Sequence, residues 1–208
     1  MEKRREIRTV GAEYAPRLRE VGEGQSRTIE GYAIVFERSS ELLNDYWDNY
    51  REIIHSGAVT QELLDASDIK MTLWHNRERL LARRNKGQGS LEVGIDEKGV
   101  WYRFDAPHTS DGDNALELVK RGDLAGSSFI YTTNEAEDVR YDKLDDGTVV
   151  RHVMRIGAIY DMTIASDPAY TDTTVNAREV EQRLNPRSED PNVGKRAARE
   201  IEKIISSI

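Results

Sequence analysis

Between about residues 28 and 175 the chain alternates short apolar runs with tight-turn signals, and this rhythm constrains the fold more than any other feature. The runs are about 4–8 residues long, which suits β-strands and is short for helices. Residues 96–99 (DEKG) and 145–147 (DDG) each separate two such runs and predict hairpin turns. About eight strands and two short helices fit this region, so we expect a mainly β fold with short helices, arranged as a barrel or a sandwich.

The predicted strands follow apolar or alternating segments. They lie at residues 28–36, 69–74, 90–95, 100–104, 127–132, 139–144, 148–156 and 158–165. One helix is expected to begin at Ser56 and run through Leu64, and a second to begin at Asp113 and end at Gly122, because these residue types cap helices. The polar and aromatic segment 37–52 is expected to be a long loop.

Both ends of the chain are polar. Residues 1–26 are rich in Arg and Glu and end in a stretch with Gly and Ser, so they predict a flexible charged arm. Residues 27–178 are expected to form the folded domain. Residues 179–208 begin as a polar linker and then place apolar residues from Ala197 to Ile208 at helical spacing. This pattern predicts a short amphipathic helix that either packs on the domain or docks another protein.

Composition excludes several classes of function. The formal net charge is −8, which argues against a nucleic-acid binder because neutralising phosphates needs a basic surface. The chain has no cysteine, so disulfides, thiol catalysis and cysteine-ligated zinc are excluded. The N-terminus is charged, and no stretch reaches the roughly 18 apolar residues of a membrane span. We therefore expect a soluble protein that is neither exported nor held in a membrane.

Without cysteine, the candidate nucleophiles are hydroxyl groups, and the candidate bases include four histidines. Imidazole suits this task because its ordinary pKa lies near neutrality. His75 ends an apolar strand and opens into a polar segment. His55 precedes a predicted helix, His108 lies in a polar loop, and His152 lies in a predicted hairpin strand. Spacing alone does not choose among the four, and a strand-end histidine more commonly has a structural role or is simply exposed.

Ser127 and Ser128 follow Gly126 at the start of a predicted strand. Neighbours in a strand point to opposite sides, so only one of the two serines can face a given cleft. Ser128 shares its face with Ile130, whereas Ser127 shares the other face with Phe129. Both serines could simply accommodate a turn beside the glycine, so this segment alone does not establish a nucleophile.

Asp161 is an acidic residue inside an otherwise apolar strand, AIYDMTIA. Burying a carboxylate costs free energy unless it is paired, so Asp161 either supports a site or forms a structural salt bridge. The chain has no phosphate-binding glycine motif and no EF-hand spacing, and we expect neither a metal nor a cofactor.

The order and spacing of six segments resemble those of the prohead proteases of tailed bacteriophages, distant relatives of the herpesvirus capsid assembly protease. The segments are GYAIVF, EIIHSGAV, LWHNRERLLAR, GSLEVGIDEKGVWYRFDAP, LVKRGDLAGSSFIY and IYDMTIASDPAYTDT, between about residues 28 and 178. The family places its nucleophile just before phenylalanine in a Gly-x-Ser-Phe motif, which maps onto Ser128. The family histidine, followed by an acid or amide, maps onto His75, and the third residue maps onto Asp161.

Four positions depart from the family pattern. Ile130 stands where glycine is usual, Asp161 stands where glutamate is usual, and Asp167 precedes Pro168 where an apolar residue is common. The histidine motif ends in LAR at residues 81–83 instead of Leu-Gly-Arg. The shorter aspartate puts in question the reach of the third residue to the histidine.

The resemblance implies a compact herpesvirus-protease-like β-barrel flanked by helices. It implies a serine endopeptidase that cleaves the major capsid protein precursor or a scaffold, and its own arms, inside the immature capsid in the host cytoplasm. Portal or other prohead components and further copies of the chain are the other implied partners. In this interpretation His75 deprotonates Ser128 and Asp161 orients His75, with no metal or cofactor.

Two other classes of function stay open on the sequence. A protease-like domain without activity would be a scaffold or an assembly chaperone, which the departures at Ile130 and Asp161 allow. A polysaccharide or nucleotide hydrolase would instead use two inward carboxylates, with Ser128 far from His75.

Overall fold

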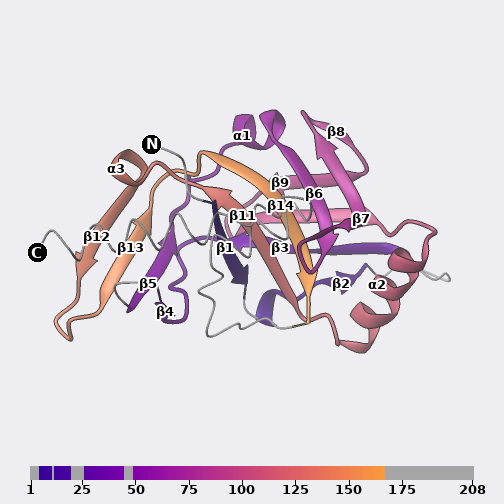
Figure 1. The fold of residues 1–208 in the computed structure, drawn as a ribbon, viewed down its shortest axis with the longest axis horizontal. Coiled ribbons are helices and arrows are strands. Elements are labelled where there is room, and N and C mark those ends of the chain that lie inside the picture. Colours follow the sequence, from indigo (N-terminus) through magenta and orange to yellow (C-terminus); the bar gives the residue numbers. More distant parts are fainter. Residues whose placement is uncertain (1–4, 11, 20–25, 45–48, 167–208) are drawn as a thin grey trace, which may run out of the picture.

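The computed structural model describes residues 5–10, 12–19, 26–44 and 49–166. These residues form a mainly β structure with three short α-helices, α1 (Gln61–Ala66), α2 (Ser110–Arg121) and α3 (Glu135–Asp138) (Figure 1). The strands are β1 (Arg5–Val10), β2 (Arg17–Leu18), β3 (Thr28–Val35), β4 (Leu43–Asn44), β5 (Asn49–Ile54), β6 (Asp68–Leu73), β7 (Asn76–Asn85), β8 (Gln88–Gly89), β9 (Leu91–Ile95), β10 (Gly99–Asp105), β11 (Gly126–Thr132), β12 (Val139–Lys143), β13 (Val149–Val153) and β14 (Ala158–Ala165).

The largest sheet has the strand order β1-β11-β14-β6-β7-β8. Strands β11 and β14 lie in the interior of this sheet and run antiparallel to each other, while β14 and β6 run parallel. Every residue of β11 is buried, as is the run Asp161–Ile164 in β14. Strands covered on both faces usually read as nearly continuous apolar runs, but β11 (GSSFIYT) and this part of β14 (DMTI) also bury serine, threonine and aspartate.

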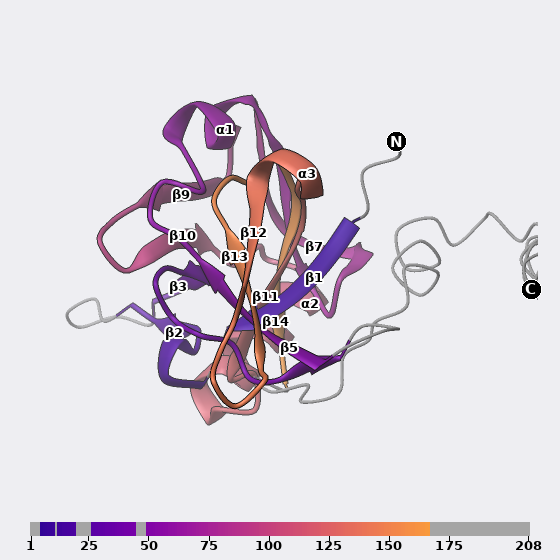
Figure 2. The same cartoon turned by 90° about the vertical axis from the view of Figure 1, so that its left-hand side faces the viewer.

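A second sheet, of order β2-β3-β10-β9, packs on one face of the first. Figure 2 shows β3, β9 and β10 on one side of the molecule, with β1 crossing toward the other side. Between the two sheets lies the main hydrophobic core, whose fully buried members include Ile29, Ile34 and Phe129. The Tyr102 hydroxyl of β10 also meets the Ser127 hydroxyl of β11 at 2.8 Å, which ties the sheets together.

The third sheet, of order β12-β13-β5-β4, lies at the end of the molecule opposite α2 (Figure 1). Its strands β13 and β5 are parallel and far apart in the sequence, whereas β12 and β13 form a hairpin. The hydrogen-bonded pairs recorded for the described residues therefore define three sheets, and a closed herpesvirus-protease-like barrel stays a prediction.

Both predicted hairpins are confirmed, by the β9–β10 and β12–β13 pairs. The predicted end of the second helix is also confirmed, because Gly122 adopts a left-handed conformation (φ 79°) as the C-cap of α2. The two predicted helix starts are wrong. Thr60 caps α1 and Thr109 caps α2, each accepting a backbone N–H with its side-chain oxygen, instead of Ser56 and Asp113. Threonine is a weaker cap than aspartate or asparagine on average, so composition alone did not favour it.

Two segments expected to lack structure contain strands. The expected loop 37–52 contains β4 and much of β5, and β5 pairs along its length with β13. The expected flexible arm 1–26 contains β1 and β2, and β1 pairs with β11 over all six of its residues. Both segments are rich in charge, and their charged side chains have partners at distant positions, such as Arg8 with Glu52.

The predicted amphipathic helix near the C-terminus and the departure from the family pattern at Asp167 lie outside the described residues. Among the residues described, no helix is long and apolar enough to cross a membrane.

Candidate active site

Three polar side chains from separate segments meet in a line beside the central strands. Ser128 comes from β11, Asp161 from β14, and His75 from the turn that follows β6. His75 Nε2 lies 2.9 Å from Ser128 Oγ, and His75 Nδ1 lies 2.6 Å from the nearer oxygen of Asp161. The imidazole therefore bridges a hydroxyl and a carboxylate, which is the geometry needed to take up a hydroxyl proton and stabilise the resulting positive charge.

Strand register explains how Ser128 and Asp161 come to share a face. Ser128 pairs with Thr163, and Asp161 lies two residues before Thr163 on the same face of β14. The β11–β14 pair has a bulge between Ile130 and Tyr131, where β14 contains one extra residue. Bulges of this kind re-aim side chains and are common beside functional sites.

His75 reaches the site through an unusual turn. Leu73 and Asn76 pair across the β6–β7 hairpin, so Trp74 and His75 alone form its loop. Both have positive φ, 52° and 56°. Two-residue hairpin loops with positive φ at both positions normally carry Asn and Gly, because a side chain with a Cβ atom costs about 1–2 kcal/mol there. The chain thus accepts backbone strain at the histidine of the site, as functional residues often do.

The site is almost closed to solvent. Asp161 is completely buried, Ser128 is 3% exposed and His75 is 5% exposed. Burial of Asp161 is compensated by His75 and by the Thr72 hydroxyl, which lies 3.2 Å from the second carboxylate oxygen. The aspartate reaches the histidine directly, which answers the concern that its side chain is shorter than the glutamate usual in the family.

The two adjacent serines have different surroundings, as their alternation in the sequence predicts. Ser127 turns toward the second sheet and meets Tyr102, whereas Ser128 turns toward His75. Ser128 Oγ also lies 2.7 Å from the main-chain oxygen of Arg8 in β1. A hydroxyl has one proton, so Ser128 donates to either His75 or this oxygen at a given moment.

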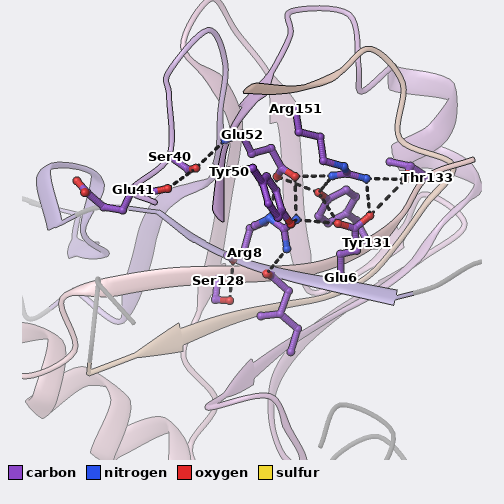
Figure 3. A network of polar contacts seen from close by, with 11 residues as sticks. Glu6, Arg8, Ser40, Glu41, Tyr50, Glu52, Ser128, Tyr131, Thr133 and Arg151 are labelled. Atoms are coloured by element: carbon purple, nitrogen blue, oxygen red, sulfur yellow. Dashed lines mark hydrogen bonds and ion pairs between the residues drawn. The ribbon is translucent and has the colours of Figure 1, made fainter. Parts of the chain in front are cut away.

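The side chain of Arg8 belongs to a second buried polar group, shown in Figure 3 and here called the Glu52 ion cluster (Glu6, Arg8, Glu52, Tyr131 and Arg151). Arg8 Nε lies 2.8 Å from Glu52, Arg151 also contacts Glu52, and Arg151 Nη2 lies 2.9 Å from Glu6. The Tyr131 hydroxyl donates to Glu52 at 2.9 Å. Figure 3 shows these groups converging, while Ser128 reaches the backbone of β1.

The pKa of Glu52 reflects two opposing effects. Burial disfavours its charged form, but attraction by Arg8 and Arg151 outweighs this and holds the pKa of Glu52 below its ordinary value. Burial meanwhile raises the pKa of Tyr131 well above its usual range, so this hydroxyl stays protonated and can donate.

The other three histidines lie away from Ser128. His55 and His152 stack with ring centroids 5.1 Å apart, and His55 Nε2 lies 2.8 Å from His152 Nδ1. Glu37 contacts His55, and the exposed His108 lies between β10 and α2. Within the described part of the chain, no group of three or more His, Asp or Glu side chains is placed to hold a metal ion.

Sequence reasoning missed two threonines of the site. Thr163 Oγ1 accepts the backbone N–H of His75 at 2.9 Å and donates to the main-chain oxygen of Thr72 at 2.8 Å. Thr72 Oγ1 lies 3.1 Å from Thr163 Oγ1. One signal was available for Thr163, which shares a strand face with Asp161 in a segment that is otherwise apolar.

A hydroxyl, an imidazole and a carboxylate in this order define the class of serine hydrolases. Within that class, the family model of the caudovirus prohead serine protease matches residues 13–186 of the chain. The chain therefore belongs to this family of peptidases, in which the resemblance of its sequence segments had placed it.

Among solved structures, the chain is similar to one described as the bacteriophage T4 capsid assembly protease, gp21. The identity is 11%, the TM-score is 0.43, and the match covers 78% of this chain and 99% of that chain. Comparison with curated proteins gives no match. Membership of the family accordingly rests on the family model.

Proposed function

We propose that Ser128 is the nucleophile of a serine endopeptidase, that His75 is its general base, and that Asp161 orients His75. The supporting observation is the unbroken chain of contacts from Ser128 Oγ through His75 to Asp161, at 2.9 and 2.6 Å. Both contacts involve opposite nitrogens of one ring, so the carboxylate fixes the tautomer that leaves Nε2 free to accept a proton.

In the first step Ser128 Oγ attacks the carbonyl carbon of a peptide bond while His75 Nε2 takes the hydroxyl proton. The imidazolium then gives that proton to the departing amine, which leaves an acyl group on Ser128. In the second step water loses a proton to His75 and attacks the acyl carbon. His75 then returns that proton to Ser128 Oγ as the bond between this oxygen and the acyl carbon breaks and the carboxylic acid product leaves. The buried Asp161 stabilises the positive charge that His75 carries between these transfers.

The substrates of this reaction are proposed from the family. We infer that the protease cleaves the major capsid protein precursor or a scaffold inside the prohead, and that it trims its own termini. The herpesvirus-protease-like barrel and self-association of the chain belong to the same proposal.

Co-expression with the capsid precursor of the same phage tests this function. Ser128→Ala should leave the precursor uncut on a gel, and Ser127→Ala is the matched control, because it removes a neighbouring buried hydroxyl that meets Tyr102. The control should still process the precursor. Processing at the wild-type rate by Ser128→Ala would overturn the assignment.

A further inference from the structure

The two amides of the strained turn are both held by β14. In a two-residue hairpin loop the N–H groups of the loop residues take no part in the ladder between the strands. A buried N–H without an acceptor is unfavourable, and His75 is buried, so its amide needs a partner inside the protein. The Trp74 amide donates to the main-chain oxygen of Ile164, and the His75 amide donates to the Thr163 side chain.

These two hydrogen bonds, which anchor the turn to β14, differ in which residue types can make them. Any residue at position 164 would supply a main-chain oxygen, but only a side chain with an acceptor can hold the His75 amide. The Thr163 hydroxyl is well oriented for this, because its proton is directed to the main-chain oxygen of Thr72 and a lone pair remains for His75. Both threonines are completely buried, so water does not replace either contact.

We propose that Thr163 is a positioning residue, whose hydroxyl fixes the backbone of His75 so that its ring lies between Ser128 and Asp161. This inference rests on the proposed function of those three residues. The turn has positive φ at two consecutive residues with side chains, so it tends to relax when an anchor is removed. Any such relaxation moves the ring, because His75 is itself one of the two loop residues.

Hydrogen exchange of the His75 amide, measured on the full chain, tests the anchoring without any substrate. Thr163→Val keeps the shape of the side chain and removes the acceptor, so the amide should exchange about tenfold faster or more. Thr163→Ser keeps the hydroxyl and should preserve the protection. Exchange of the β11 amides, measured in the same samples, shows whether a variant has lost global stability. Unchanged protection of the His75 amide in a folded Thr163→Val variant would overturn the proposal. If Thr163→Val does not fold, the exchange rates of the His75 amide in Thr163→Ser and Thr163→Ala are compared instead.

Labelling by a serine-reactive phosphonate tests the consequence for the reaction. Thr163→Val should lower the maximal labelling rate of Ser128 by about 100-fold, because small misplacement of a catalytic group costs that much. The probe concentration for half-maximal rate should not change, and Thr163→Ser should recover most of the rate. A purely structural role would lower Tm and leave this rate intact, which would contradict the proposal.

The two failures can be told apart. If Ser128 of the wild-type chain takes no label, the proposed catalytic roles are wrong, whatever happens at Thr163. If Ser128 is labelled in the wild type and equally fast in Thr163→Val, only the positioning role is wrong.

Discussion

The proposed catalytic group of Ser128, His75 and Asp161 and the Glu52 ion cluster are both buried and polar, yet their charges are arranged differently. The ion cluster sets two carboxylates, Glu6 and Glu52, against two guanidinium groups that are always charged. In the catalytic group the buried carboxylate faces an imidazole, which is neutral until it accepts a proton.

This difference indicates what each group can do. The ion cluster is balanced as it stands, so it can hold β1 against the third sheet and need not change during a reaction. In the proposed mechanism, His75 gains a positive charge beside Asp161 when it takes the proton of Ser128 during attack on a substrate. Substitutions in the proposed catalytic group should therefore mainly lower the cleavage rate, whereas substitutions in the Glu52 ion cluster should mainly lower stability.

The largest expected effect is that of His75→Ala. Removing the general base should lower the cleavage rate on the order of a millionfold. The measurement is cleavage of capsid precursor over time, together with thermal unfolding of the purified variant. A variant that cleaves within tenfold of the wild type would show that the base lies elsewhere.

Asp161→Asn should have the next largest effect. The amide cannot hold the same tautomer or stabilise the imidazolium, so we expect a rate about 10⁴-fold lower in the same assay. Full activity in this variant would make Asp161 a structural partner of His75 and would leave a pair instead of a triad.

Glu52→Gln should act on stability instead of rate. The substitution removes the negative charge that faces the buried guanidinium groups of Arg8 and Arg151. The free energy of unfolding should therefore fall by about 3–5 kcal/mol. The control is Glu92→Gln, which breaks the exposed ion pair with Arg103 and should cost about 1 kcal/mol or less. Equal losses in urea unfolding of the two variants would show that the ion cluster has no special role.

The smallest expected effect is a dependence on pH. Glu52 has a lowered pKa in the folded state, so its contribution is complete above the ordinary glutamate pKa of about 4.3 and is lost as pH falls toward the folded value. The stability difference between wild type and Glu52→Gln should therefore shrink between about pH 5 and pH 3. A difference that stays constant over this range would mean that the pKa of Glu52 is not lowered in the folded protein.

The sequence predicted the features that local pattern determines. Strand alternation separated Ser127 from Ser128, and turn residues located both hairpins. An acidic residue in an apolar strand marked Asp161, although the resemblance to a family was needed to connect it with His75 and Ser128.

Local pattern did not predict the features that depend on distant partners. β1 appeared to be a charged arm because Arg8 finds Glu52 only after folding, 44 residues away along the chain. The role of Thr163 was not predicted, because its hydroxyl accepts a hydrogen bond from the amide of His75, 88 residues earlier in the chain. The positive φ angles of that turn could not be predicted either, because Trp74 and His75 are not residue types that favour a turn.

Mass spectrometry of the full chain after reaction with a serine-reactive phosphonate tests the central claim most directly. The account predicts one adduct, located on Ser128, absent from Ser128→Ala and formed far more slowly in His75→Ala, while Ser127→Ala is labelled as the wild type is. An adduct that forms on Ser128 at the same rate without His75, or a wild-type chain that cleaves capsid precursor with Ser128 unlabelled, would contradict it.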